Sequence, residues 1–195
     1  MPIPKSYYIW CDESEKHGAY YSNFYGGILI RSTDYKKVVD VMQKTVASLH
    51  GVDDEIKWQK VNEYHFEAYK KLVDMLFDLL AKDLVKIRIF FRHNKNVSIP
   101  NTEEWKDAEY LKLYYQFIKH SFGLQFSNKS NRTIQVHLML DDIPMDGVKK
   151  ENFKNFLVGL SHDKDFSDAH ISIKRENISE VESKIALALS PIPAS

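Results

Sequence analysis

The order of strand-like and helix-like segments constrains the fold of this chain most strongly. Two strand-like segments open the sequence, residues 6–12 and 23–31, and helix-like and strand-like segments alternate after them. An opening hairpin followed by alternating helices and strands is typical of a mixed sheet with helices packed on it. The sequence therefore predicts an α/β fold, and its 195 residues are compatible with a single domain over 1–195.

The segments are defined by the spacing of their apolar residues, which is two in a strand and about 3.6 in a helix. Residues 17–22 are predicted to form a polar turn between the first two strands. Gly26 and Gly27, inside the second strand, predict a bulge or a close approach of the backbone to another element. The other predicted elements are a helix from about 32 to 51, a helix at 63–82, a strand at 84–92, a helix at 103–122, a strand at 133–140, a helix at 149–160 and a short strand at 171–173.

Acidic pairs follow two of the predicted strands. Asp12-Glu13 ends the first strand, and Asp141-Asp142 ends the strand at 133–140. If these strands lie side by side in parallel, both pairs sit at the sheet edge where ligands of open α/β sheets tend to bind. Glu55, in the segment Glu55-Ile56-Lys57-Trp58, is a further candidate acid.

The chemistry of such a cluster points to a divalent cation. Carboxylates held close together stay ionised only when a cation lies between them, and hard oxygen ligands favour Mg²⁺ or Mn²⁺ over zinc. Two such ions about 4 Å apart can activate water and stabilise the leaving oxygen of a phosphodiester. The alternative is that strands often end in Asp because Asp suits turns, which is the better explanation for either pair taken alone.

The charge balance and the spacing of cysteine, histidine and acidic residues argue against several other kinds of site. The chain has 27 basic and 27 acidic residues, so binding to a polyanion has to come from a local patch. The single cysteine, Cys11, permits no intramolecular disulfide, and its position beside acids favours a structural role. The histidines lack zinc-ligand spacing, and residues 163–168 lack the Gly and the distal Glu of a calcium loop, so we expect a solvated loop there.

The sequence shows no apolar run of signal-peptide or membrane-span length, which predicts a cytoplasmic protein without a membrane partner.

Aromatic residues are concentrated in the opening hairpin. They are Tyr7, Tyr8, Trp10, Tyr20, Tyr21, Phe24 and Tyr25. Such a cluster could stack on nucleic-acid bases, although hairpin core and cross-strand pairing are the more common use of these residues.

Five motifs, in order along nearly the whole chain, resemble the DUF3800 domain family. They are Tyr8-Ile9-Trp10-Cys11-Asp12-Glu13-Ser14, Phe24-Tyr25-Gly26-Gly27, Glu55-Ile56-Lys57-Trp58, Leu140-Asp141-Asp142 and Glu180-Val181-Glu182-Ser183-Lys184. The resemblance implies a ribonuclease-H-like fold and a nuclease that depends on Mg²⁺ or Mn²⁺, with nucleic acid as its partner and a link to mobile elements or phage defence.

The resemblance also implies roles for individual residues. Asp12 would be the central metal ligand, with Glu55 and Asp141 as the second and third catalytic acids. Supporting ligands would be Glu13, Asp142 and Glu182, and the substrate contacts would be Lys57, Ser14 and Lys184.

The sequence departs from the family pattern at several points. Glu15 replaces a Gly in the opening motif, and Glu182 replaces an Asp in the last motif. After Lys184 the chain lacks the Gln and Asp of the family's final helix, so we expect that helix to be incomplete. An incomplete helix would leave apolar surface for a second copy. These departures leave open a second hypothesis, a catalytically inactive ribonuclease-H-like module for binding or assembly.

Overall fold

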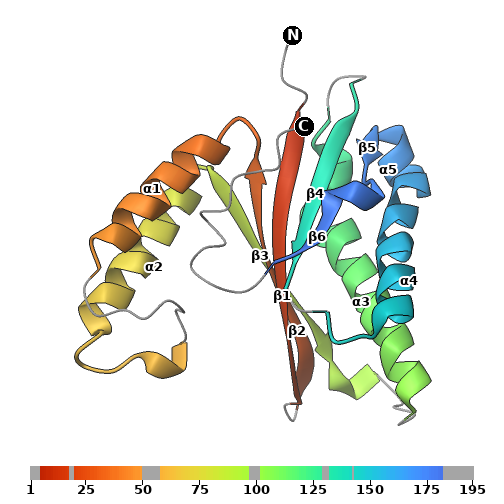
Figure 1. Ribbon diagram of the computed structural model, residues 1–195, viewed down its shortest axis with the longest axis horizontal. Coiled ribbons are helices and arrows are strands. Elements are labelled where there is room, and N and C mark those ends of the chain that lie inside the picture. Colours follow the sequence, from red (N-terminus) through yellow and green to blue (C-terminus); the bar gives the residue numbers. More distant parts are fainter. Residues whose placement is uncertain are drawn as a thin grey trace.

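A mixed sheet of six strands lies between two layers of helices (Figure 1). A computed structural model gives this structure, and it describes residues 5–17, 20–49, 58–96, 102–128, 132–141 and 143–181. Helices α1 (Tyr35–Ala47) and α2 (Phe66–Ala81) cover one face of the sheet, and α3 (Glu103–Ser121), α4 (Gly147–Val158) and α5 (Lys164–Asp168) cover the other. No helix in these ranges is long and apolar enough to cross a membrane.

The strand order is β3-β2-β1-β4-β5, and β6 also pairs with β4. The strands are β1 (Ser6–His17), β2 (Tyr21–Arg31), β3 (Val85–His93), β4 (Ile134–Leu140), β5 (Ile171–Ser172) and β6 (Ile178–Glu180). The first three form an antiparallel meander, whereas β4 is parallel to β1, and β5 and β6 are parallel to β4. This arrangement confirms the predicted mixed sheet with helices packed on it, and it contains the parallel pairing under which the two acidic pairs were expected to meet.

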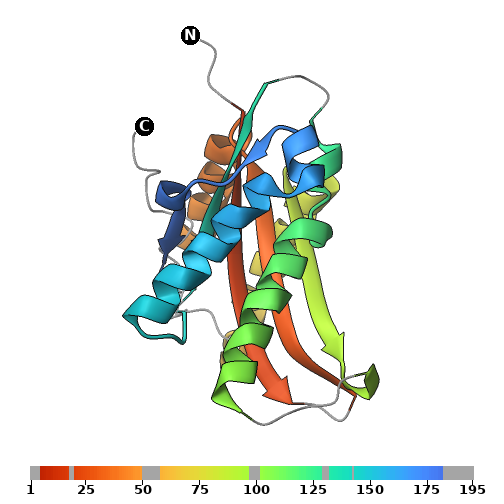
Figure 2. The same ribbon diagram turned by 90° about the vertical axis from the view of Figure 1, so that its right-hand side faces the viewer.

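Alternate residues of β1 belong to different layers, because neighbouring side chains in a strand point to opposite faces. Tyr7, Ile9 and Cys11 are buried in the core beneath α3 and α4, which Figure 2 shows in front of the sheet. Trp10 points to the other face and packs against the smaller cluster beneath α1 and α2. The structural role predicted for Cys11 agrees with this position, since its buried thiol has a pKa raised by burial and by the charges of Glu13 and Asp12.

Gly27 is the point where β2 passes closest to α3. A Cβ atom at this position would lie 2.9 Å from Cζ of Phe122, 3.0 Å from Cζ of Phe117 and 3.0 Å from the carbonyl oxygen of Trp10. The close backbone approach predicted from the two glycines is therefore confirmed at Gly27. At Gly26, among the residues that the structure describes, a Cβ would meet only the carbonyl oxygen of Asp12, at 3.9 Å.

Four elements differ from the sequence prediction. β1 continues to His17 and β2 begins at Tyr21, so both strands extend into the segment predicted as a turn. The segment predicted as a solvated loop contains α5, whose first turn is capped by the Asp163 side chain accepting from the N–H of Asp165 at 3.1 Å. β6 lies beyond the last strand predicted from the sequence; it is only three residues long and is formed by pairing with β4.

We expect Gly27→Ala to lower the free energy of unfolding by about 1–3 kcal/mol, because the added methyl group overpacks the contact with α3. Gly26→Ala is the matched control, and it should be neutral or stabilising by up to about 1 kcal/mol, since alanine loses less chain entropy than glycine in a strand. Urea denaturation of both variants measures the difference. Equal stability of the two variants would show that α3 moves away without cost.

Candidate functional site

Asp12 and Asp141 lie side by side where the parallel pairing of β1 with β4 ends. Cys11 of β1 is in register with Leu140 of β4, and the next residue of each strand is an aspartate. The N–H of Asp141 donates to the carbonyl oxygen of Cys11 at 3.1 Å, which continues the pairing of the strands to the acids themselves. The rigid sheet therefore holds two carboxylates together.

The two carboxylates influence each other electrostatically. The side chain of Asp12 reaches solvent, but the surrounding protein still raises its pKa by removing water, and the negative charge of Asp141 raises it further. A backbone hydrogen bond at Glu13 partly opposes this shift. Among the described residues, neither aspartate forms an ion pair that would neutralise it. Like charges held together in this way attract a cation or a proton.

An open groove of about 410 Å³ contains the two acids. Gly26 pairs with Asp12 across β1 and β2 and lies on the same face, so the position opposite Asp12 in β2 adds no side chain to the space beside the carboxylate. Ile89 of β3 and Val181, which follows β6, form the sides of the groove. This role of Gly26 is not evident from the sequence, because the register that sets it opposite Asp12 has no local signal.

Arg88 also lines the groove, but its guanidinium is engaged on the α3 side of the sheet. Its Nε donates to the carbonyl oxygen of Ser121, the last residue of α3, at 2.9 Å. This bond gives one of the end carbonyls of α3 a charged partner, which stabilises a helix end. Arg88 therefore contributes positive charge near the groove without pairing with Asp12 or Asp141.

Glu13 has a different position from the one predicted. Its side chain points to the opposite face from Asp12, because the two residues are neighbours in one strand. Its Oε1 accepts a hydrogen bond from the hydroxyl of Tyr110 at 2.8 Å, and its Oε2 accepts one from the hydroxyl of Tyr114. Burial raises the pKa of Glu13, and the two phenol hydrogen bonds oppose that shift. Glu13 thus anchors β1 to α3 and does not share a site with Asp12.

Ser14 lies two residues beyond Asp12 and pairs with Phe24 of β2. Before the irregularity that follows Ser14, alternation in β1 places its side chain on the same face as Asp12. This position is compatible with the predicted contact to a substrate.

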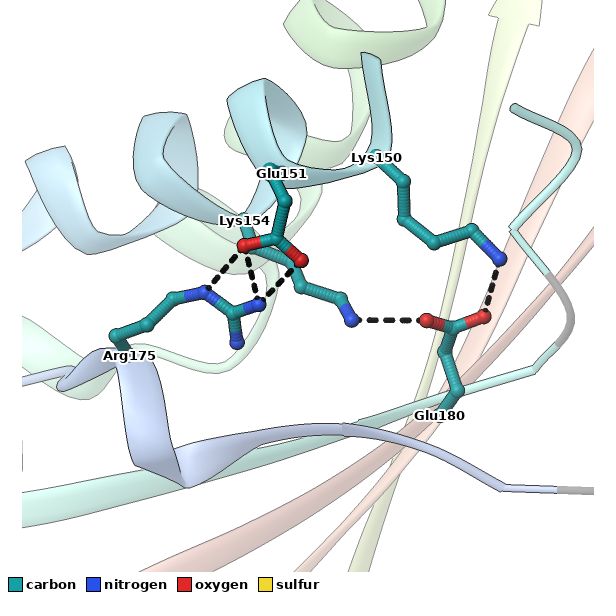
Figure 3. A network of polar contacts seen from close by, with 5 residues as sticks. All are labelled: Lys150, Glu151, Lys154, Arg175 and Glu180. Atoms are coloured by element: carbon teal, nitrogen blue, oxygen red, sulfur yellow. Dashed lines mark hydrogen bonds and ion pairs between the residues drawn. The ribbon is translucent and has the colours of Figure 1, made fainter. Parts of the chain in front are cut away.

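A network of ion pairs fixes the strand end beside the groove (Figure 3). Glu180 of β6 accepts from Nζ of Lys150 at 2.6 Å and from Nζ of Lys154 at 2.8 Å. Both lysines belong to α4, and the side chain of Lys154 is only 10% exposed. The N–H of the next residue, Val181, donates to the carbonyl oxygen of Leu140 at 2.9 Å. Helix α4 therefore holds Val181 at the groove.

The other predicted site residues lie outside the described residues. They are Glu55, Lys57, Asp142, Glu182 and Lys184. The ranges that the structure describes contain no group of three or more His, Cys, Asp or Glu side chains able to hold a metal ion. Of the predicted acids, the structure therefore brings together Asp12 and Asp141.

Two solved structures are similar in their arrangement. Bst-RNase HIII in complex with Mn²⁺ is 10% identical with a TM-score of 0.43, over 90% of this chain and 45% of that chain. A mutant protein of Bst-RNase HIII is 11% identical with a TM-score of 0.40, over 93% of this chain and 46% of that chain. This chain thus spans less than half the length of either protein.

Comparison with protein-family models gave no match, and comparison with curated proteins gave none either. The candidate site is therefore defined by the chain's own residues.

We expect Glu180→Gln to lower the free energy of unfolding at neutral pH by about 1–3 kcal/mol, because it leaves the nearly buried Lys154 without its anion. Burial alone would raise the pKa of Glu180, but the hydrogen bonds and charges of Lys150 and Lys154 hold it below its usual value. A lowered pKa in the folded state stabilises the protein above the unfolded pKa, and this contribution disappears as the pH falls through the folded pKa.

The difference between the wild type and Glu180→Gln should therefore shrink below about pH 4. Urea denaturation at several pH values measures it. Glu176→Gln is the control, since that side chain is 69% exposed and its ion pair with Lys174 is long, at 3.8 Å; its effect should stay below about 1 kcal/mol. If the wild type remained more stable than Glu180→Gln by the same amount in acid, the pairing of Glu180 with Lys150 and Lys154 would be contradicted.

Proposed function

We propose that this protein is a nuclease that hydrolyses phosphodiester bonds of DNA or RNA with the help of Mg²⁺ or Mn²⁺. The observation that carries the proposal is the pair of adjacent aspartates, Asp12 and Asp141, without an ion-pair partner among the described residues and facing an open groove. A pair of turn acids would need no groove and would separate in solvent to reduce repulsion. These two are held together by the register of parallel strands.

The donor set of this pair fits a hard divalent cation. Mg²⁺ is usually bound through one or two carboxylates, several waters and the phosphate groups of a substrate. Asp12 and Asp141 would hold the ion, and their mutual repulsion would be relieved by it. When bound, such an ion supplies Lewis acidity for hydrolysis of a phosphodiester.

The chain's own residues would bind and orient the substrate. In the hydrolysis, the oxygen of water forms a bond to phosphorus, the bond from phosphorus to the ester oxygen breaks, and that oxygen takes up a proton. Gly26 leaves room beside Asp12 for the substrate backbone. Ser14, on the face of Asp12, is a polar contact for it.

The residues outside the described ranges keep their predicted roles within this proposal. Glu55, Asp142 and Glu182 would be further ligands, and Lys57 and Lys184 would contact the substrate. Membership of the DUF3800 family, with a link to mobile elements or phage defence and a cytoplasmic location, is likewise proposed from the motifs alone.

We expect Asp12→Asn and Asp141→Asn each to lower hydrolysis by about 100-fold or more, because even loss of an outer-shell partner of a metal ligand costs 10- to 100-fold. The assay uses labelled DNA and RNA with Mn²⁺ or Mg²⁺. Asp74→Asn, at an exposed position on α2, is the matched control and should retain full activity. Activity that survives both substitutions at the groove would remove this mechanism.

We expect Mn²⁺ to raise the melting temperature of the wild type and to leave that of Asp12→Asn unchanged. Binding to the folded state alone stabilises it by about 2.7 kcal/mol when the ion is at 100 times its Kd. In chelator, Asp12→Asn should be at least as stable as the wild type, since it removes the repulsion with Asp141.

Differential scanning fluorimetry with and without Mn²⁺ measures both effects. A metal-dependent shift without hydrolysis would favour the alternative, a catalytically inactive module for binding or assembly. The absence of any shift in millimolar Mn²⁺ would argue against both a metal site and the nuclease.

A further inference from the structure

Four aromatic side chains form a continuous strip at the hairpin end of the sheet. Tyr21 and Phe24 come from β2, and Phe91 and His93 come from β3. The ring of Tyr21 lies 5.0 Å from the rings of both Phe91 and His93, and the ring of Phe24 lies 5.7 Å from that of Phe91. We refer to these four residues as the aromatic strip.

The aromatic strip is exposed and continuous with the groove. Tyr21 is 42% exposed and Phe91 is 47% exposed. Asp12, Gly26 and Ile89 form one row across β1, β2 and β3, and Ile89 is 67% exposed. Phe91 and His93 follow Ile89 at intervals of two residues along β3, so all three point to the same face as Asp12. In Figure 1 the hairpin end of β1 and β2 extends beyond α1 and α2, the helices that cover this face of the sheet.

A β-bulge in β2 creates the aromatic strip. The register of β2 and β3 shifts between Ser22 and Tyr25, so that Asn23 and Phe24 both lie opposite Phe91. Asn23 has a φ of 53°, in the left-handed region that Asn tolerates better than most residues. Tyr21 and Phe24 are three residues apart and would point to opposite faces of a regular strand. The extra residue brings both rings to Phe91.

A buried polar network on the other side of the sheet fixes the bulge. Arg92 is 9% exposed; its Nη2 donates to Oγ of Ser22 at 3.0 Å, and it forms an ion pair with Glu109 of α3. Nδ2 of Asn23, in the bulge itself, donates to Oε2 of Glu109 at 3.5 Å. The rings are therefore held in place before any ligand binds, which reduces the entropy lost on binding.

We propose that the aromatic strip stacks the unpaired bases of a single-stranded nucleic acid whose backbone passes the Asp12–Asp141 pair. This inference rests on the proposed function and deepens it, because it makes the preferred substrate single-stranded. At about 3.4 Å per residue, Phe91 lies roughly 7 Å and His93 roughly 14 Å beyond Ile89. Bases stacked about 3.4 Å apart would therefore meet the strip roughly two to four nucleotides beyond Ile89, at the edge of the groove.

Charge and chemistry favour a nucleic acid over a protein as the occupant. β2 and β3 contain no acidic residue that would repel a phosphate backbone, and the exposed Lys95 follows β3. Aromatic side chains on a sheet are a recurrent platform for two or three bases, and stacking tolerates any base sequence. A single strand also presents unpaired faces, which a duplex does not.

The test is fluorescence anisotropy of labelled dT and rU 12-mers and of a DNA duplex, in chelator so that no hydrolysis occurs. The key variant is Phe91→Leu, which keeps the apolar character and removes the aromatic face. We expect it to weaken binding of single strands about tenfold, and Phe91→Leu with Tyr21→Leu about 100-fold. Phe77→Leu is the matched control, because Phe77 is 63% exposed on α2, outside the aromatic strip, and it should bind like the wild type.

Thermal melting of each variant checks its fold, and Tyr21→Leu alone replaces Phe91→Leu if the latter unfolds. The inference is overturned if the strip variants bind single strands like the wild type, if the duplex binds as tightly as the single strand, or if the wild type binds no oligonucleotide. Hydrolysis of single strands with an unchanged KM in Phe91→Leu would defeat the inference and leave the proposed function standing. Binding of single strands that depends on the aromatic strip, without any hydrolysis, would support the inference and contradict the proposed nuclease activity.

Discussion

The parallel pairing of β1 with β4 is the interaction on which the rest of the structure depends. It joins segments about 130 residues apart, and it is supported by completely buried side chains on the α3 face, among them Ile9 and Leu138. Side chains alternate along a strand. A shift of one residue in either strand would therefore turn an aspartate toward α3 and α4, and an apolar residue toward the groove. The apolar core therefore fixes the register that places Asp12 beside Asp141.

Three carboxylates at this end of the sheet differ in their hydrogen-bond and ion-pair partners. Glu13 is held by the hydroxyls of Tyr110 and Tyr114, and Glu180 by two lysines of α4. Both point toward the α3 and α4 layer and serve to attach strands to helices. Asp12, on the opposite face, receives no such partner among the described residues and is further opposed by Asp141. The division follows from strand alternation, and it leaves one acidic pair available for chemistry.

Much of this arrangement follows from local patterns in the sequence. The strand periods and their terminal acids predicted that Asp12 and Asp141 meet if the two strands pair in parallel, and the double glycine predicted a bulge or a close backbone approach, of which the close approach is found at Gly27. Alternation within β1 would also have separated Glu13 from Asp12, had it been applied past the expected strand end. β6 and the bulge at Asn23 lie beyond such reasoning, because a three-residue strand has no period and the bulge depends on a buried network between β2, β3 and α3.

Two features of the structure oppose stability, and they occupy one continuous surface. Like charges are held together at Asp12 and Asp141, and aromatic rings are exposed at Tyr21 and Phe91, beside a residue in the left-handed region. Exposed rings and left-handed residues also occur elsewhere, for example at Tyr64, Phe126 and His170, but the rings of Tyr21 and Phe91 share a face with the Asp12–Asp141 pair. Conflicts between local preference and structure are expected at functional sites, where selection for activity offsets their cost. The position of the acids and the aromatic strip on one continuous face is therefore an argument, independent of any relative, that they serve the same ligand.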